Sequence, residues 1–168
     1  MGHGLKLVAA VLLAGGLLVS CGGSDEATDD ESSAGQSTGS GDEGGGGDAS
    51  DVADQLSQAV ESATEVVAIT EDNDPNDLIG RPTGYVSAAV IYDEGAECDE
   101  LGSDCGATVE VWRSAEEAQD RSDYIQGILE ASPILGTEYN YLDGAVLLRV
   151  SGELKPSVAS EYEAAFSG

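Results

Sequence analysis

A stretch from Gly22 to Ser50 divides the chain into two parts with different capacities for folding. It contains nine glycines, several acids, no Lys or Arg, and no aliphatic residue larger than alanine. Such a segment cannot bury enough apolar surface to offset the loss of chain entropy, so we expect residues 21–50 to form a disordered tether. The folded part is then expected within residues 51–168, a size typical of one small domain.

The segment before the tether has the anatomy of a secretory signal peptide. Lys6 precedes an uncharged run from Leu7 to Leu18, and the small pair Val19-Ser20 follows. The run is shorter than the roughly 20 apolar residues that span a bilayer. An ordinary signal peptide with a stray cysteine near the cut would leave an exposed thiol after export.

Leu18-Val19-Ser20-Cys21 resembles the lipobox of bacterial lipoproteins, in which the signal is cut before a cysteine that then carries acyl chains. The resemblance implies a lipoprotein signal peptide at residues 1–20 and a lipidated, palmitate-bearing Cys21. It also implies anchoring of the chain at the extracytoplasmic face of the cell membrane, where two or more acyl chains give stable attachment.

The charge of residues 51–168 limits the partners of the domain. This part holds 25 Asp and Glu against five Lys and Arg. A field of that sign repels phosphates, so we expect no nucleic-acid partner, whereas basic partners and cations fit better. Adaptation to salt or simple solubility explains the same composition.

Cys98 and Cys105 lie in a polar loop between two strand-like runs. In a chain exported to an oxidising compartment we expect them to form a disulfide. A metal site that uses both thiolates with Asp99, Glu100 or Asp104 is the alternative, but it lacks histidine and the CxxC spacing of zinc sites.

Hydrophobic periodicity and turn residues predict most of the secondary structure. Residues 66–70 are β-branched and fit either a strand or the end of the first helix. Asp143-Gly144 is a strong hairpin signal, and Ser114 with Glu117 forms a capping box. The predicted helices cover residues 50–63, 114–129 and 156 onward, and the predicted strands cover residues 85–92, 108–112, 138–142 and 145–151.

This order predicts an α+β fold. After the first helix the elements follow the order ββαββα, which suggests one antiparallel sheet of about four strands. We expect the helices to pack on a single face of the sheet, with the other face at least partly solvated. In the last strand Val146, Leu148 and Val150 line one face, and Leu147 and Arg149 line the other.

Six short segments follow one another in residues 74–168: Asp74–Pro82 (DPNDLIGRP), Val109–Trp112 (VEVW), Ala118–Ile125, Glu138–Tyr141 (EYNY), Leu147–Gly152 (LLRVSG) and Glu161–Glu163. In these segments and their spacing, residues 74–168 resemble a family of small lipoproteins from Gram-positive bacteria, chiefly actinobacteria. The resemblance implies the membrane location but no activity, because the family has no assigned catalytic residues. Lys155 stands where similar sequences tend to place a capping Thr, and the cysteine loop looks like an insertion found in some members.

The residue types of the mature chain exclude most catalytic chemistry. The only histidine, His3, is expected to leave with the signal peptide, which removes histidine-dependent triads and metal sites. Lys155 is the single lysine after the signal peptide and fits a helix start better than a catalytic dyad. A pair of carboxylates could hydrolyse cell-wall glycans, but a domain of this size has little room for the required cleft. We therefore expect no enzyme.

Two groups of residues are candidate binding sites. Asp72, Asp74 and Asn76 have the alternate spacing of a calcium loop, although Pro75, Asp77 and Thr83 break the pattern and a series of Asx turns explains it equally well. No other cofactor is indicated.

Arg81 and Arg149 either pair with neighbouring carboxylates or bind an anionic ligand beside Tyr85, Tyr139 and Tyr141. The sequence thus predicts a lipid-anchored, non-enzymatic module at the outer membrane face that binds an unknown protein or small ligand. A calcium-responsive module built on residues 71–77 is the alternative.

Overall fold

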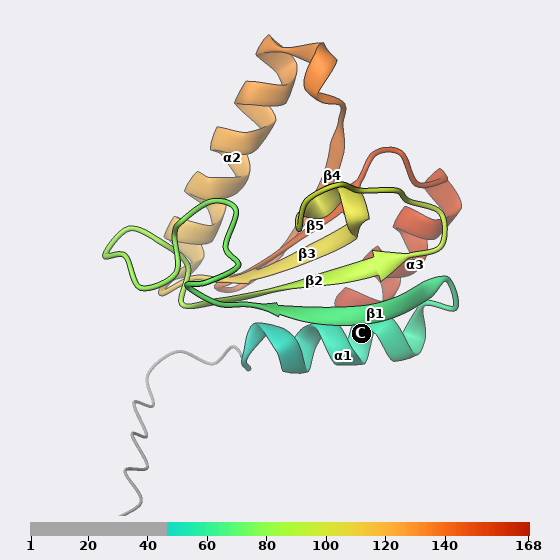
Figure 1. The fold of residues 1–168 in the computed structure, drawn as a ribbon, viewed down its shortest axis with the longest axis horizontal. Coiled ribbons are helices and arrows are strands. Elements are labelled where there is room, and N and C mark those ends of the chain that lie inside the picture. The colour runs from blue at the N-terminus through green and yellow to red at the C-terminus, as the bar shows by residue number, and fades with distance from the viewer. Residues whose placement is uncertain (1–46) are drawn as a thin grey trace, which may run out of the picture. The chain divides into compact units, whose positions relative to one another are not determined.

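The structure, a computed structural model, describes residues 47–168. The predicted signal peptide, Cys21 and the tether up to residue 46 lie outside the described residues. The elements, shown in Figure 1, are the helices α1 (Ala49–Ala59), α2 (Ala115–Ala131) and α3 (Pro156–Phe166), the strands β1 (Ala63–Ile69), β2 (Ser87–Asp93), β3 (Gly106–Val111), β4 (Glu138–Asp143) and β5 (Val146–Ser151), and the short 3-10 helices η1 (Ser103–Cys105) and η2 (Pro133–Leu135).

The first helix begins and ends earlier than its periodicity predicts. Asp48 is the N-cap, and its side chain accepts a hydrogen bond from the Ser50 amide, so the fold begins inside the segment assigned to the tether. Ala49, Ala53 and Leu56 are the buried residues of α1, a spacing of one helical face. The open question about residues 66–70 is resolved, because β1 occupies Ala63–Ile69 as a strand.

All five strands of the described chain form one antiparallel sheet in the order β1-β2-β3-β5-β4. The α+β class and the antiparallel sheet are confirmed, and β1 adds an edge strand to the predicted four. The predicted hairpin is present as β4 and β5. Asp143 pairs with Val146, so the two-residue turn is Gly144-Ala145, one position later than expected, and Gly144 takes the positive φ of 54° that the turn needs.

Helices α1 and α3 pack on one face of the sheet. Leu56 of α1, the C-cap residue Val60 and Tyr162 of α3 pack in one core with residues of the sheet, namely Ile91, Val109, Leu148 and Val150. The Tyr162 hydroxyl is buried and donates to Asp93 Oδ2 at 3.1 Å, so the polar end of this large side chain is satisfied. Figure 1 shows α1 running beneath the β1 edge of the sheet.

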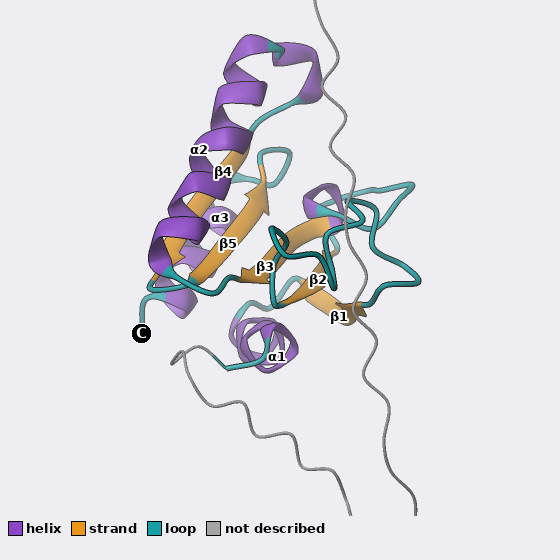
Figure 2. Cartoon of the chain, turned by 90° about the vertical axis from the view of Figure 1, so that its left-hand side faces the viewer, coloured by secondary structure: helices purple, strands orange, loops and turns teal. Residues whose placement is uncertain are grey.

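The prediction that all helices lie on one face is wrong, because α2 covers the opposite face. Ala118 of α2 packs with Leu147, Val90, Ala88 and Trp112 in a second core. Figure 2 shows α2 beside β4 and β5 and far from α1. Strand β3 is buried along its whole length, and the β1 end of this face stays partly open, at Val67 and Tyr92.

The start of α2 follows the predicted capping box in part. Ser114 Oγ accepts from the Glu117 amide at 3.2 Å, but the Glu117 carboxylate accepts from the Arg113 amide rather than from Ser114. Lys155 precedes Pro156 at the start of α3 and makes no side-chain cap. Both helix starts therefore stand where the sequence places them.

Candidate functional site

The face of the sheet under α2 carries an ordered set of charged and polar side chains. Strand register places Asn140, Arg149 and Thr108 opposite one another across β4, β5 and β3. Because side chains alternate along a strand, Glu138 and Glu110 point to the same face, each two residues from a member of this row. Three neighbouring strands thus bring a carboxylate, a guanidinium and a second carboxylate together.

Arg149 joins the two carboxylates. Its Nε and Nη2 donate to Glu138 Oε2 and Oε1 at 2.9 and 2.7 Å, and its Nη1 donates to Glu110 Oε1 at 2.8 Å. Burial lowers the pKa of the Arg149 guanidinium, but its hydrogen bonds and charge interactions with Glu138 and Glu110 outweigh burial and raise that pKa. The guanidinium therefore stays charged at all physiological pH values, and its bidentate geometry fixes Glu138 in place.

Glu110 is fully buried and ties α2 to the sheet. Besides Arg149 it accepts from Arg121 Nε at 3.2 Å and from Trp112 Nε1 at 3.2 Å. Arg121 comes from α2, so this contact links the helix to β3 across the face. Two guanidiniums balance two carboxylates, and the set carries no net charge. We call Glu110, Arg121, Glu138 and Arg149 the buried ion network.

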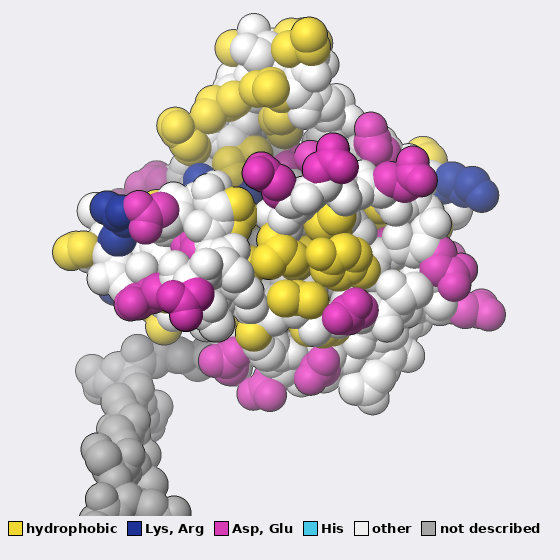
Figure 3. Space-filling view, viewed as in Figure 1, with side chains coloured by type: hydrophobic (Ala, Val, Ile, Leu, Met, Phe, Trp, Pro, Cys, Tyr) yellow, Lys and Arg dark blue, Asp and Glu magenta, His cyan; other side chains and the backbone are white. Residues whose placement is uncertain are grey.

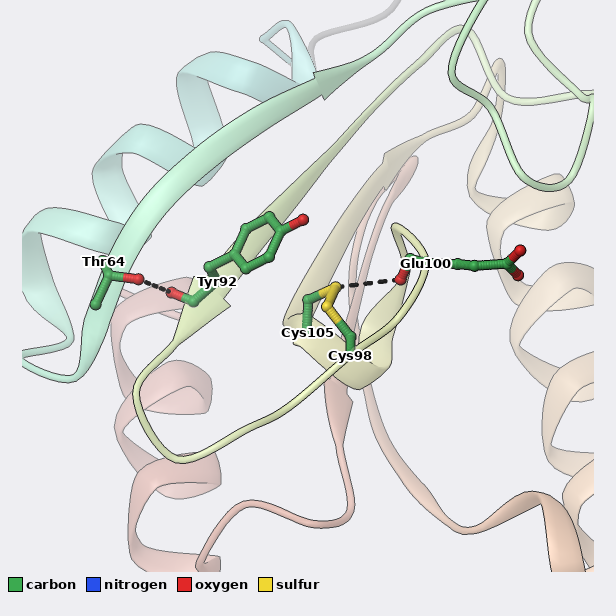
Figure 4. The surroundings of a disulfide bond; sticks show 5 residues. All are labelled: Thr64, Tyr92, Cys98, Glu100 and Cys105. Atoms are coloured by element: carbon green, nitrogen blue, oxygen red, sulfur yellow. Dashed lines mark hydrogen bonds between the residues drawn. A yellow bond between two sulfur atoms is a disulfide. The ribbon is translucent and has the colours of Figure 1, made fainter.

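The loop between β2 and β3 closes over the network and is fixed by the predicted disulfide, Cys98–Cys105, which is confirmed. Ser103 of this loop donates from Oγ to Glu138 Oε1. Figure 4 shows the disulfide near Tyr92. The carbonyl oxygen of Glu100 lies 3.3 Å from Cys105 Sγ, which is a van der Waals contact and not a hydrogen bond, because a disulfide sulfur has no proton to donate. The disulfide therefore holds the loop that reaches the ion network.

A groove lies above the ion network, between α2 with η2 on one side and the cysteine loop on the other. It consists of two adjoining hollows of about 870 and 480 Å³, which share Asn76, Glu138 and Arg149 as lining residues. We call it the α2 groove. Its apolar wall is formed by Tyr124, Ile125, Ile128, Leu129, Ile134 and Leu135.

The opposite lip of the α2 groove is acidic. Figure 3 shows apolar side chains along the projection formed by α2 and η2, and acidic side chains along the loops below it. Of the basic residues within 47–168, only Arg149 and Arg121 line the groove, and both belong to the buried ion network. The acids of the lip are Glu97, Asp99, Glu100, Asp104 and Glu153.

The calcium candidates are arranged as a turn. Both oxygens of Asp74 accept hydrogen bonds, Oδ1 from the Asn76 amide and the Tyr85 hydroxyl, and Oδ2 from the amides of Leu78 and Ile79. Asp72 is exposed. Within residues 47–168 no group of three or more His, Cys, Asp or Glu side chains is placed to hold a metal ion. Asp74 thus acts as the organiser of an Asx turn, and calcium binding at Asp72, Asp74 and Asn76 stays a prediction.

The predicted ligand-binding residues are not brought together. Tyr139 and Tyr141 pair with Val150 and Leu148, which belong to the α1 and α3 core, so they lie on the face opposite Arg149. Arg81 forms an exposed ion pair with Asp77. Both arginines pair with carboxylates, which is the other interpretation that the sequence left open.

Sequence reasoning missed four residues that shape the site. Glu110 falls on the strand face opposite Val109 and Val111, the face expected to be at least partly solvated. Arg121 and Glu138 entered only as parts of longer segments and not as site residues, and Ser103 belongs to a loop. The available signal is a charged residue in the middle of an apolar strand, VEVW, which is costly to bury unless it is paired. Arg149, in LLRVS, has the same signal.

The comparisons with known proteins identify no relative: no protein-family model, no curated protein and no solved structure matches the chain. None of the helices in residues 47–168 combines the length and the apolar character needed to cross a bilayer.

Proposed function

We propose that this chain is a lipid-anchored, non-enzymatic binding module at the outer face of the cell membrane, related to small lipoproteins of Gram-positive bacteria, and that it takes its ligand in the α2 groove. The lipobox-like sequence ending at Cys21 supports this location at the cell membrane. The ligand is a protein segment or a small molecule, and nucleic acid is disfavoured by the excess of 20 negative charges over residues 51–168.

One observation carries the choice of the α2 groove. It has a rigid floor, the buried ion network, and a wall of exposed apolar side chains, of which Tyr124 is 62% and Leu135 is 58% exposed. Clustered apolar side chains beside a hollow, with a few fixed polar groups, are typical of binding sites. The two carboxylates of the floor, Glu110 and Glu138, both bind the Arg149 guanidinium, which argues against this pair as the acid and base of a glycan hydrolase.

The proposed membrane location is tested with a Gram-positive host that expresses the protein. The host is fed an alkyne fatty acid, which labels lipidated proteins. We expect label and membrane association for the wild type and loss of both the label and signal cleavage for Cys21→Ala. The double variant Cys98→Ser/Cys105→Ser, which removes the other two cysteines, should be labelled like the wild type. Equal labelling of Cys21→Ala, or a cytosolic pool of the wild type, contradicts the proposal.

The site is tested by photocrosslinking on intact cells. A benzophenone amino acid at Leu135, in the α2 groove, should give adducts of discrete mass, whereas the same group at Gln58, exposed on α1, should not. No adduct at position 135, or the same pattern at both positions, contradicts the assignment of the groove.

A further inference from the structure

We propose that the α2 groove binds an extended peptide segment of a partner protein in which basic and apolar side chains alternate. This inference rests on the proposed function and names the class of its ligand. Four observations support it: an unpartnered apolar wall, an acidic lip across from it, a floor without net charge, and the strong negative charge of the whole domain.

The apolar wall is the first observation. Ile134 is 94% exposed, Leu135 is 58% exposed, and both lie on η2 at the end of α2. Tyr124 and Ile128 continue the wall down α2 toward the sheet, where Ile125 is already buried. These side chains line one side of the same groove, so an apolar partner group placed there would cover several of them at once.

The acidic lip faces this wall. Glu97, Asp99 and Glu100 precede η1, Asp104 lies within it, and Glu153 follows β5. Among the described residues none of these five carboxylates forms an ion pair. The arginines that line the groove are already paired in its floor, Arg121 with Glu110 and Arg149 with both Glu110 and Glu138. The groove therefore offers negative charge that no basic side chain of the domain neutralises.

The floor and the spacing favour an extended chain. The ion network carries no net charge and is held by β3, β4, β5 and α2, so a ligand does not have to reorganise it. In an extended peptide successive side chains point to opposite sides. Alternating basic and apolar residues would thus direct cations to the acidic lip and apolar groups to the wall of α2 and η2.

Charge also selects against other occupants. A second copy of this domain would bring two acidic lips and two domains with 20 excess negative charges each into contact. Anionic lipid headgroups would be repelled in the same way. A small organic cation satisfies the lip but leaves the wall exposed.

The test measures binding of fluorescein-labelled twelve-residue peptides by anisotropy, with the full protein purified from membranes in a zwitterionic detergent. The probes are alternating Lys and Val, alternating Glu and Val, and alternating Lys and Ser. We expect the Lys–Val peptide to bind about tenfold more tightly than either of the others. Its affinity should fall as salt is raised, because exposed charges on the lip are screened.

Three variants locate the binding. Ile134→Ser/Leu135→Ser removes part of the wall, and Asp99→Lys/Glu100→Lys reverses charge on the lip. Asp54→Lys/Glu61→Lys makes the same charge change at exposed positions in and just after α1. Affinity for the Lys–Val peptide should fall about tenfold in the first two variants and stay within about threefold of wild type in the third.

Equal affinity for the Lys–Ser and Lys–Val peptides, or unchanged binding in the wall variant, overturns the inference. So does failure of the Lys–Val peptide to bind. If discrete crosslinks at Leu135 persist on cells in that case, the groove binds a ligand of another class and only the present inference fails. Concentration-dependent dimers, or binding to anionic vesicles that the wall variant loses, would identify a second copy or a membrane as the occupant and overturn it equally.

Discussion

Replacing Arg149 with methionine should destabilise the fold strongly. The substitution keeps a long side chain but removes the guanidinium that binds Glu138 through two oxygens and Glu110 through one. The side chain of Arg149 is 12% exposed, and those of Glu110 and Glu138 are 0% and 8% exposed. The variant therefore leaves carboxylates buried without their shared cation.

The expected cost follows from this burial. Removing one partner of a buried ion pair costs about 3 to 5 kcal/mol, because the remaining charge is uncompensated. Glu110 keeps Arg121 and Trp112 as donors, so we expect the lower end, about 3 kcal/mol. Arg81→Met is the matched control: the Arg81–Asp77 side chains are 53% and 77% exposed, and its cost should be at most about 1 kcal/mol.

The assay is urea unfolding at pH 7, followed by far-UV circular dichroism and by the fluorescence of Trp112, the only tryptophan. With a slope of about 1 to 3 kcal/mol per molar urea, a loss of 3 kcal/mol lowers the midpoint by about 1 to 3 M. Arg149→Met/Glu138→Leu removes the stranded carboxylate as well and should recover part of the loss. A cost of Arg149→Met below about 1 kcal/mol, or a double variant no more stable than the single one, would refute the reasoning.

Two further outcomes test the loops that border the groove. Cys98→Ser/Cys105→Ser should lower the free energy of unfolding by about 2.5 kcal/mol, the entropic value for so short a loop, and urea unfolding with and without reductant checks it. Burial raises the pKa of Asp74, but hydrogen bonds from Tyr85 and three backbone amides outweigh burial and lower that pKa. The ionised Asp74 carboxylate therefore stabilises the fold above about pH 4, and this stabilisation is lost as the pH falls through the depressed pKa. Tyr85→Phe should therefore lower the urea midpoint at pH 7 and differ less from wild type at pH 3; an equal difference at both pH values contradicts this role.

Local signals in the sequence predicted the parts of the fold that depend on neighbouring residues. The Asp143-Gly144 signal identified the β4–β5 hairpin, Ser114 marked the start of α2, and the two cysteines of one polar loop formed the expected disulfide. Each of these features is decided within a few residues of chain. The positions of these features were correct to within one residue. The reciprocal hydrogen bond of the capping box differs, because the Glu117 carboxylate accepts from the Arg113 amide and not from the Ser114 amide.

The side of the sheet covered by α2 was not predictable by the same reasoning. Residues 88–91 read Ala-Ala-Val-Ile, a continuous apolar run typical of a strand buried on both faces, which speaks against a solvated second face of the sheet. The burial of Glu110 depends on Arg149 and Arg121, which lie 39 and 11 residues away and arrive from β5 and α2. Only the tertiary arrangement shows that Glu110, in the middle of β3, forms an ion pair with Arg149 of β5.

The most direct test of the groove is an NMR titration of the ¹⁵N-labelled protein in micelles with the Lys–Val peptide. The account predicts saturable shifts of amides in three segments that line the groove, residues 97–104, 124–129 and 134–138, with the amides of α1 and α3 unchanged. Shifts concentrated on α1 and α3, or small shifts spread over every acidic surface, would contradict it.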